Sequence, residues 1–275
     1  MITARLIQSG HCDAATNMAI DEAIFLSYKE NISAPTLRFY GWKPAAVSIG
    51  CSQNPQNTLD LETCQKQNIA FVRRPTGGGI IFHEHELTYS LVLAEGDLGL
   101  SCRVKESFEN ITSFLITAYQ DLGIDACFAK NTSGPRTEDH TVADFCFSRK
   151  EEYDILVNGK KLGGNAQKRR RNIILQHGSI PLSFDKAKAS KLLKDRHTSG
   201  PPDITTFYDV ARYKIDETAL SDALTKAFNS HFKTTLKLDN LTNEEKILAE
   251  ELKSSKYADQ EWNFHASIAA QARVA

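Results

Sequence analysis

The chain reads CFSRKEEYDILVNGKKLGGNAQKRRRNIILQHGSIPL from Cys146 to Leu182, and this stretch does most to decide the fold. Alternating apolar residues predict strands at Tyr153–Val157 and Ile173–His177. Asn158-Gly159 directly follows the first strand, and this pair favours a two-residue type I′ turn, because both central positions of that turn need a positive φ. Lys161 is therefore expected at the start of the returning strand of a β-hairpin.

The residues after Lys161 carry little side-chain bulk. The segment Leu162-Gly-Gly-Asn-Ala-Gln167 lets a ligand lie against the main chain, because glycine has no Cβ to block the approach. Side chains alternate along a strand, so Lys160 and Lys161 face opposite sides and at most one of them points into a site. The pattern does not decide which of the two lysines it is.

A second informative stretch reads FVRRPTGGGIIFHEHELTYSLVL from Phe71 to Leu93. Three consecutive glycines between strand signals cost conformational entropy, which favours a ligand-binding loop at Gly77-Gly78-Gly79 over a merely loose one. N–H groups exposed at such a turn suit a carbonyl, a phosphate or an acyl chain. Strands are expected on both sides of His83, at Ile80–Phe82 and Leu87–Leu93.

Helices and strands are interspersed along the rest of the chain. Periodicity and capping signals predict helices at Asn17–Lys29, Leu59–Gln67, Val104–Gly123, Leu220–Phe232 and Asn243–Ser254, and strands at Thr36–Tyr40 and Ala46–Gly50. Thr16 or Asn17 is expected to cap the first helix, with Asp21-Glu22 near its positive end.

Strict βαβ alternation is missing, and several strand pairs have short connections. We therefore predict an α+β fold with mixed, largely antiparallel sheets flanked by helices. Residues 1–265 are expected to form a single domain and residues 266–275 a flexible tail.

The composition excludes several classes of protein. The chain has 275 residues and a net charge of −1, which argues against a dedicated nucleic-acid binder. It has no apolar run of about 18 residues and no signal-peptide layout, so we expect no membrane association. The six cysteines, at positions 12, 51, 64, 102, 127 and 146, form no C-x-x-C pair and are expected to be reduced thiols of a cytoplasmic protein.

Cys146 is the candidate nucleophile. It follows a loop-like stretch at 131–144 and precedes a strand, with Lys161 within reach across the hairpin. A thiol with an ordinary pKa of about 8.5 is a weak nucleophile until a nearby cation lowers that pKa, and Lys161 can supply the charge. The alternatives are that Cys146 is a small buried hydrophobe and that Lys161 is an ordinary solvated lysine.

His83 is expected to line a pocket or to bond a backbone carbonyl, and His177 is interpreted as either a pocket wall or a core histidine. His83 and His85 lie two residues apart, but no third ligand at a telling spacing accompanies them, so we expect no metal. Neither a Walker loop nor a dinucleotide-binding fingerprint occurs, and no cofactor is expected. The basic run Lys168–Arg171 is interpreted as a solvated turn, or else as a docking patch for an acidic protein or a phosphopantetheine arm.

Taken as a set, these motifs resemble the family that joins lipoyl and octanoyl groups to proteins, the lipoate–protein ligases and octanoyltransferases. The matching residues are Asn17-Met-Ala-Ile-Asp-Glu22, Arg73-Arg74-Pro-Thr-Gly77-Gly78-Gly79-x-x-x-His83, Gly159-Lys-Lys161-x-x-Gly-x-Ala166-Gln167, His177-Gly178 and Glu261-Trp262-Asn263, with Tyr257 before the last. The resemblance implies the fold shared with biotin–protein ligase, an α+β domain around an acyl-binding tunnel. It also implies substrate-binding roles for Arg73, Gly77, Gly78, Gly79, His83, Gly163, Gly164, Asn165, Ala166, His177 and Gly178.

Three features resemble the octanoyltransferase branch of that family. Cys146, fifteen residues before Lys161, resembles its acyl-thioester cysteine. Glu152-Tyr153-Asp154 stands where stand-alone ligases have Arg-Asn-Asp for the adenylate, and the chain stops soon after Asn263, where such ligases usually add an accessory domain.

The resemblance thus implies that octanoyl passes from acyl carrier protein to Cys146, and then to a lysine of an apo lipoyl domain or of the glycine-cleavage H protein. Lys161 would lower the thiol pKa or stabilise the oxyanion. The alternatives are an ATP-dependent lipoate–protein ligase, an amidotransferase that moves octanoyl or lipoyl groups between protein lysines, and a non-catalytic acyl-binding protein.

Overall fold

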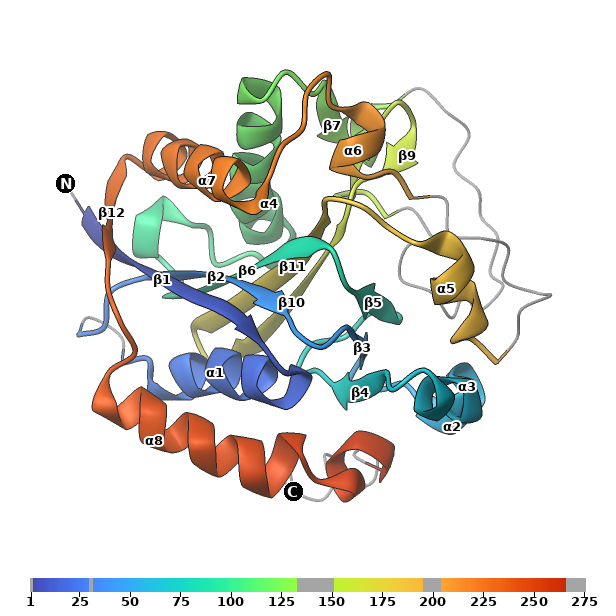
Figure 1. Cartoon of the computed structure of the whole chain (residues 1–275). Helices are drawn as coiled ribbons and strands as arrows, with labels where there is room; N and C mark the ends of the chain where they lie inside the picture. Colours follow the sequence, from blue (N-terminus) through green and yellow to red (C-terminus); the bar gives the residue numbers. More distant parts are fainter. Residues whose placement is uncertain (1, 30–31, 133–150, 195–203, 266–275) are drawn as a thin grey trace.

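A computed structural model of the chain describes residues 2–29, 32–132, 151–194 and 204–265. Its centre is a six-stranded sheet in the order β10-β11-β6-β2-β1-β12 (Figure 1). These strands are β1 (Ile2–Cys12), β2 (Thr36–Trp42), β6 (Glu86–Ala94), β10 (Gly164–Arg170), β11 (Ile173–Pro181) and β12 (Thr234–Leu238). β1 runs parallel to both of its neighbours, and the other pairings are antiparallel. The sheet confirms the predicted α+β class.

Two three-stranded sheets carry the segments that the motifs singled out. One has the order β4-β3-β5, formed by β4 (Ala70–Arg73), β3 (Ala46–Ile49) and β5 (Ile81–His83), and the glycine triplet connects β4 to β5. The other has the order β7-β8-β9, formed by β7 (Ala126–Phe128), β8 (Ile155–Val157) and β9 (Lys160–Lys161). The glycine loop and Lys161 therefore belong to different sheets.

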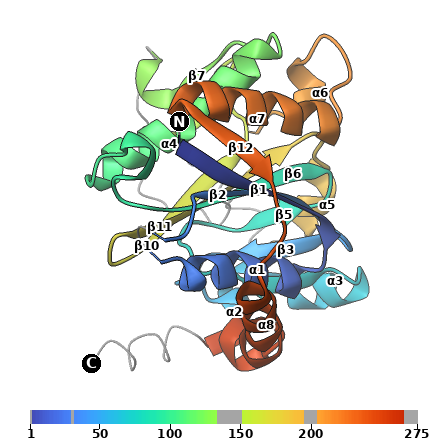
Figure 2. The ribbon, with the colours of Figure 1, turned by 90° about the vertical axis from the view of Figure 1, so that its left-hand side faces the viewer.

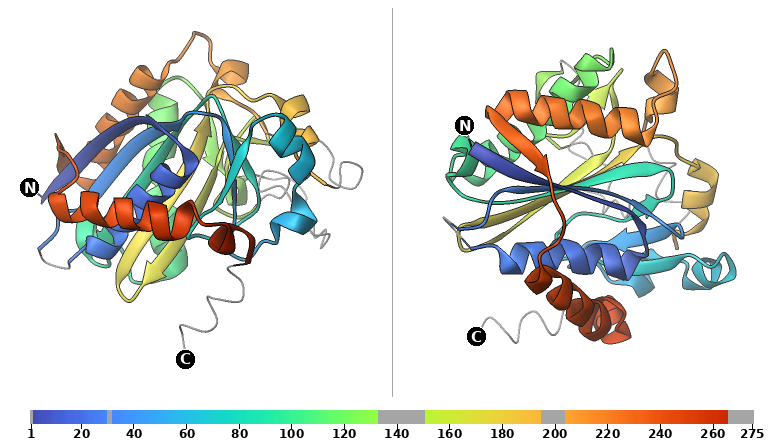
Figure 3. Two further views of the ribbon diagram at one scale, coloured as in Figure 1. Left: turned by 60° about the horizontal axis from the view of Figure 1, so that its bottom comes forward. Right: turned by 60° about the vertical axis from the view of Figure 1, so that its left-hand side comes forward.

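Helices cover both faces of the six-stranded sheet, because side chains alternate along its strands. The helices α4 (Val104–Asp121) and α7 (Glu217–Phe232) pack on the face that presents Leu91 and Leu93 (Figure 2). α1 (Ala14–Ser27) packs on the opposite face, which presents Val92 and Ala94. α8 (Asn243–Leu252) lies against α1 on the side away from the sheet (Figures 1 and 3).

The remaining elements are short. They are α2 (Pro55–Thr58), α3 (Leu61–Lys66), α5 (Lys186–Lys191), α6 (Phe207–Val210), the 3₁₀ turns η1 (Asp97–Gly99) and η2 (Ala129–Asn131), and the π-helical turn η3 (Lys253–Tyr257). Most of the predicted helices and strands are found, with ends shifted by a few residues. α8 has the predicted cap, because Thr242 and Glu245 form a capping box.

The predicted cap of α1 was wrong. The helix begins at Ala14, and the side chain of Asp13 accepts the Thr16 N–H at 2.9 Å. Asn17 lies inside the helix instead, where its buried amide donates to the Gly41 carbonyl at 2.9 Å. A buried helix does not show its start by a change from polar to apolar residues, so the pattern placed the cap too late.

Asp21 and Glu22 consequently lie in the middle of α1 and not near its first turn. Both are buried, at 0% and 5% exposure. A buried carboxylate needs a partner closer than a helix dipole, and both residues find one, as described below.

The predicted hairpin is confirmed. Asn158 and Gly159 have φ values of 51° and 75°, as a type I′ turn requires, and Val157 pairs with Lys160. The structure also answers which lysine points inward, because Lys160 is exposed and Lys161 is buried.

The basic run is not a solvated turn. Lys168–Arg170 belong to β10, and only Arg171, with a φ of 54°, lies in the turn. Arg169 forms an ion pair with Glu95 and donates to the hydroxyl of Ser107. The solvated-turn interpretation was wrong because charged residues at the edge of a sheet can stay in a regular strand when one of them finds a partner on a neighbouring element. The alternative, a docking patch, stays a prediction.

Some expectations concern residues outside the described ranges. Cys146, the tail at 266–275 and most of the loop at 131–144 lie outside them, so the division of the chain at residue 265 stays a prediction. In the described ranges, no helix has both the length and the apolar character that crossing a bilayer requires. The same ranges contain no group of three or more His, Cys, Asp or Glu side chains arranged to hold a metal ion.

Candidate functional site

A cavity lies between the six-stranded sheet, α1 and the β4-β3-β5 sheet, and its volume is about 360 Å³ when its opening to solvent is included. Its lining comprises Met18, Tyr40, Trp42, Ser48, Arg74, Ile81, His83, Thr88, Gly164, Asn165, Ala166, His177, Gly178 and Ser179. Six of the predicted site residues meet here: His83, Gly164, Asn165, Ala166, His177 and Gly178. They come from β5 and from the adjacent strands β10 and β11, which lie about 80 residues later in the sequence, so only the folded chain brings His83 to the others.

The wall formed by β10 and β11 needs small residues. Asn165 lies opposite Gly178 in the antiparallel register. A Cβ on Gly178 would lie 2.2 Å from the Asn165 side-chain oxygen and 2.6 Å from a ring carbon of Tyr89. The Tyr89 hydroxyl donates to that same Asn165 oxygen at 2.8 Å. This bond fixes the amide, and its NH₂ group has no hydrogen-bond partner among the described residues.

Gly163 serves the backbone and does not line the cavity. Its φ of +81° is in the left-handed region, and a Cβ there would lie 2.2 Å from the Ser179 carbonyl oxygen. Its predicted substrate-binding role stays a prediction, but the strand could not pass so close to β11 with any other residue.

Arg74 holds the glycine loop. Its guanidinium donates to the carbonyls of Gly77 and Gly79 at 2.7 and 2.8 Å, and it lines the cavity. A Cβ on Gly50 would lie 2.0 Å from the Gly78 carbonyl oxygen, so the loop also packs directly on the end of β3. None of Gly77, Gly78 and Gly79 is among the residues that line the cavity, and their predicted contacts with a substrate stay a prediction.

Arg73 points away from the cavity. Its guanidinium is 1% exposed and donates to five backbone carbonyls, those of Gly50, Cys51, Gln53, Trp262 and Asn263. Burial lowers the pKa of this guanidinium from its ordinary value. The predicted contact of Arg73 with a substrate stays a prediction, and the structure adds a backbone-organising role that the motif did not reveal.

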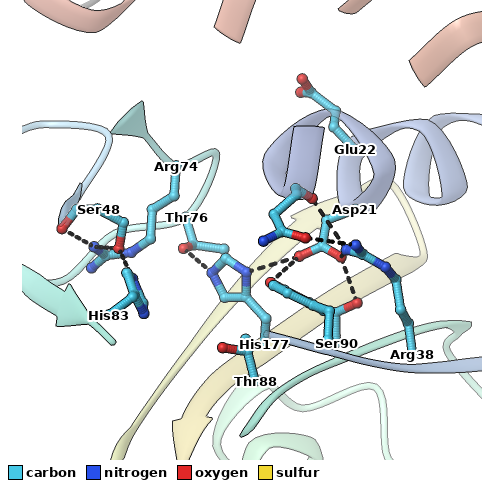
Figure 4. A network of polar contacts seen from close by, with 12 residues as sticks. Asp21, Glu22, Arg38, Ser48, Arg74, Thr76, His83, Thr88, Ser90 and His177 are labelled. Atoms are coloured by element: carbon cyan, nitrogen blue, oxygen red, sulfur yellow. Dashed lines mark hydrogen bonds and ion pairs between the residues drawn. The ribbon is translucent and has the colours of Figure 1, made fainter. Parts of the chain in front are cut away.

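His177 is at the centre of a buried polar network (Figure 4). Its Nε2 lies 2.6 Å from Thr76 Oγ1, and its Nδ1 lies 3.4 Å from Asp21 Oδ2. Burial lowers the pKa of His177, so the ring is neutral at pH 7. The neutral ring then donates from Nδ1 to the Asp21 carboxylate and accepts the Thr76 hydroxyl proton at Nε2.

Asp21 is held ionised by its neighbours. Burial alone raises its pKa, but the Arg38 guanidinium, 2.6 Å away, together with His177 and Ser90, keeps that pKa below the ordinary value. The Tyr40 hydroxyl also donates to this carboxylate, at 2.8 Å. The carboxylate thereby fixes the orientation of the His177 ring.

His83 forms a similar arrangement on the other side of the cavity. Its Nδ1 lies 2.8 Å from Glu86, its Nε2 lies 2.8 Å from the Ser48 hydroxyl, and its ring stacks on Trp42 with centroids 3.8 Å apart. Burial raises the pKa of Glu86, but His83 and the hydroxyls of Thr88 and Ser179 together lower it below its ordinary value.

Lys161 is buried beside a carboxylate. It is 2% exposed, and its Nζ lies 2.8 Å from Asp154 Oδ2. The main chain of Lys161 is fixed as well, because it pairs with Leu156 and its carbonyl accepts the Thr205 N–H at 2.9 Å. A buried ammonium is retained when a counter-charge lies this close. Whether Cys146 lies near Lys161 stays a prediction.

An open groove adjoins the cavity. It has an empty volume of about 780 Å³ and is lined by Val104, Lys105, Phe108, Glu151, Glu152, Tyr153, Asp154 and Asn165. Asn165 lines both spaces. Asp154, the partner of Lys161, lies on the groove side.

Several site residues were missed from the sequence. Arg74 and Thr76 belong to the quoted motif, yet only their neighbours were selected. Asp21 had a readable signal, since an acidic residue in the middle of an apolar helix needs a buried partner. Asp154 had none, because its contact with Lys161 depends on how the hairpin folds back.

Comparisons with known proteins agree with this geometry. The model of the family described as lipoyl protein ligase A/B catalytic domain matches residues 13–229. The chain belongs to this family. The resemblance drawn from the motifs is thereby confirmed.

Within the family, the chain is similar to proteins named Octanoyltransferase LipM. It is 35% identical to that of Geobacillus kaustophilus over 274 residues, which cover 94% of this chain and 97% of the relative. It is 34% identical to that of Bacillus subtilis over 279 residues, which cover 95% of this chain and 98% of the relative.

Solved structures of the family share the fold. A lipoate-protein ligase A bound with ATP superposes with a TM-score of 0.80 at 25% identity, covering 96% of this chain and 100% of that one. A bi-partite lipoate protein ligase from Thermoplasma acidophilum, described together with its E2 lipoyl domain, has a TM-score of 0.80 at 24% identity, with coverage of 97% and 98%. These likenesses confirm the lipoate-ligase fold expected from the motifs.

Proposed function

We propose that this protein is an octanoyltransferase of protein lipoylation that uses Cys146 as its nucleophile. The donor would be octanoyl-acyl carrier protein, and the acceptor a lysine of an apo lipoyl domain or of the glycine-cleavage H protein. The observation that carries the proposal is the similarity to octanoyltransferases of the same family, which are 34–35% identical over nearly the whole chain. The cavity, Asn165 and Lys161 support it with a place for each part of the reaction.

The octanoyl chain would occupy the cavity. Met18, Trp42 and Ile81 give it apolar walls, and Gly164 and Ala166 leave room along the main chain. Burying roughly six methylene groups contributes about 5 kcal/mol, at about 0.8 kcal/mol for each group. The cavity would thus bind the octanoyl chain through apolar contacts alone, as suits a fatty acyl group.

The first step would exchange one thioester for another. The Cys146 thiolate attacks the carbonyl carbon, a new C–S bond forms, and the bond to the phosphopantetheine sulfur breaks. The departing thiolate takes up a proton equivalent to the one that Cys146 lost. Because one thioester replaces another, the step is close to isoenergetic and needs no ATP.

Lys161 and Asn165 would stabilise the charges that develop. Asp154 keeps the Lys161 ammonium in place, where a positive charge favours a nearby thiolate. Asn165 lines both the cavity and the groove, and its NH₂ group would donate to the oxyanion of the tetrahedral intermediate.

The second step would form the product. The amine of the acceptor lysine attacks the octanoyl-Cys146 carbonyl, a C–N bond forms, and the C–S bond to Cys146 breaks. A proton from the amine passes to the departing thiolate. An amide is more stable than a thioester, so this step runs downhill and restores the enzyme.

Intact mass spectrometry would test the proposal. The protein is mixed with octanoyl-acyl carrier protein without ATP, and the adduct is mapped by peptide analysis. We expect an octanoyl group on Cys146 that disappears when apo H protein is added, and no adduct in Cys146→Ser. Cys127→Ser is the matched control, because Cys127-Phe128 repeats the same dipeptide within β7.

Two other results would redirect the assignment. No adduct, but transfer from free octanoate or lipoate once ATP is present, would identify a ligase. An adduct that forms only from octanoyl-H protein would identify an amidotransferase. Full transfer activity in Cys146→Ser would refute the thioester route.

A further inference from the structure

The last part of the described chain connects α1, which borders the cavity through Met18, with β4, which leads directly into the cavity residue Arg74. Residues 256–263, here called the C-terminal clamp, follow α8 and contact both α1 and β4. The family motifs include Tyr257 and Glu261-Trp262-Asn263, and the proposed reaction gives these residues no role.

The clamp holds α1 at Glu22. Lys256 Nζ donates to both carboxylate oxygens of Glu22, at 2.8 and 2.6 Å, and the Tyr257 hydroxyl donates to one of them at 2.8 Å. The π-helical turn η3 lets these two consecutive residues reach the same carboxylate, and such widened turns recur at functional sites. Glu22 adjoins Asp21 and points to the opposite side of α1 (Figure 4).

The clamp also holds Arg73. The Lys256 ammonium lies 4.0 Å from the centre of the Trp262 ring, and the Trp262 indole N–H donates to the Arg73 carbonyl at 3.0 Å. In return, the Arg73 guanidinium donates to the carbonyls of Trp262 and Asn263, both at 2.9 Å. The Asn263 side-chain oxygen accepts the Arg73 backbone N–H at 2.8 Å.

Arg73 also links the C-terminal clamp to the segment on which the glycine loop packs. The same guanidinium donates to the carbonyls of Gly50 and Cys51, at 3.3 and 3.0 Å. Gly50 is the residue whose Cβ would meet the Gly78 carbonyl, and the next residue after Arg73 is Arg74, which holds the loop carbonyls. A continuous set of short contacts therefore runs from Glu22 through the clamp to the loop.

We propose that the C-terminal clamp and Arg73 together position α1 and Arg74 at the acyl cavity, and through Arg74 the glycine loop that it holds. Arg73 is then a positioning residue that acts through Arg74 and the loop. This inference rests on the proposed function in one respect, namely that the cavity holds the octanoyl chain.

The chemistry of the contacts indicates that the clamp sets the positions of its partners and does not merely attach the C-terminal segment. Buried ion pairs add little net stability compared with apolar residues of similar shape, and their better-attested use is to select one arrangement. An apolar contact would attach the C-terminal segment equally well. It would not set the place of each carbonyl around Arg73, whereas a planar guanidinium with five donors does.

The test compares three variants of one segment. Lys256→Met removes the charge that joins Glu22 to Trp262, and Lys256→Arg restores it. Lys253→Met is the matched control, because Lys253 also links η3 to α1, by a 3.1 Å ion pair with Asp13, without a bond to Glu22 or Arg73 in the described structure.

Hydrogen exchange of the ligand-free protein gives the first readout. The amides of Cys51 and Arg74 are bonded to the carbonyls of Thr76 and Ile49, at 2.9 and 3.0 Å, and so report on the loop. In Lys256→Met, peptides covering 46–51 and 74–79 should exchange about 2-fold to 30-fold faster. Lys256→Arg and Lys253→Met should keep the wild-type rates. Unchanged exchange in Lys256→Met would overturn the proposal.

Octanoyl transfer gives the second readout. Lys256→Met should lower kcat/KM for the octanoyl donor by a similar factor, while Lys256→Arg and Lys253→Met keep wild-type values. Faster exchange with undiminished transfer would also overturn the positioning role. If the wild-type protein transfers no octanoyl group at all, the proposed function fails, and the exchange experiment still decides whether the clamp holds the loop.

Discussion

Asp21 is the residue whose removal from the buried network has the most calculable effect. Its carboxylate accepts four hydrogen bonds, from Arg38 and Ser90 at one oxygen, at 2.6 and 2.7 Å, and from Tyr40 and His177 at the other, at 2.8 and 3.4 Å. The side chains of Asp21 and Arg38 are both 0% exposed. Only an ionised carboxylate has acceptors at both positions and a charge to match the guanidinium.

Asp21→Asn keeps the shape and removes both properties. The Arg38 guanidinium loses its counter-charge, and the new NH₂ group faces donors on one side of the amide. Breaking a buried ion pair in this way costs about 3–5 kcal/mol. The Coulomb energy at this separation, about 6 kcal/mol at an effective dielectric constant of about 20, is a ceiling. We expect the free energy of unfolding to fall by about 4 kcal/mol, a large part of the roughly 5–15 kcal/mol of a typical domain.

Urea unfolding followed by circular dichroism would measure this loss. Tyr40→Phe is the control, since it removes one neutral donor from the same carboxylate and should cost about 1 kcal/mol. The double variant Asp21→Asn/Arg38→Met should recover part of the loss, because it also removes the uncompensated charge. A loss below about 1 kcal/mol in Asp21→Asn, with an unchanged slope against urea, would refute the reasoning.

Three further predictions concern the same cavity. Burial lowers the pKa of His177 below 6.5, so at lower pH the unfolded chain binds a proton that the folded chain excludes. The free energy of unfolding should therefore fall as the pH drops below about 6.5. Urea midpoints measured across that range should fall less in His177→Gln than in the wild type. Gly178→Ala places a methyl group against Asn165 and should cost about 1–3 kcal/mol of unfolding free energy, whereas Gly77→Ala, with open space at its Cβ, should cost much less when thermal unfolding of the two is compared. Asn165→Ala should lower kcat for octanoyl transfer by about 100-fold to 1,000-fold with little change in KM, and a rate within a factor of two of the wild type would exclude an oxyanion role.

Local patterns in the sequence decide the elements and much of the site. The Asn158-Gly159 pair favours a type I′ turn where it joins two strands, and this placed Lys161 in the returning strand β9, which begins one residue earlier than expected, at Lys160. The residues from Gly164 to Ala166 have too little apolar bulk to fill a hydrophobic core, and they line the cavity. Such features are predictable because the turn and the strand are governed by neighbours in the chain.

Partners across the fold were not predictable in the same way. The sequence presents Arg73 and Arg74 as equivalent, but one guanidinium is turned to the C-terminal clamp and the other to the glycine loop. His83 and His177 were expected at a pocket, and the carboxylates that orient them, Glu86 of β6 and Asp21 of α1, were identified only in the folded structure.

The sequence by itself therefore determined the α+β class, the hairpin that carries Lys161, the small-residue wall and membership of an acyl-transferring family. These follow from backbone preferences, side-chain alternation and motifs, all of which act over a few neighbouring residues. Only the tertiary structure decided which lysine is buried, which arginine lines the cavity and which carboxylate orients each histidine ring. Those choices depend on contacts such as that of Lys161 with Asp154 or of Arg73 with Asn263, and a buried charge is stable only where the fold delivers its partner to within hydrogen-bonding distance.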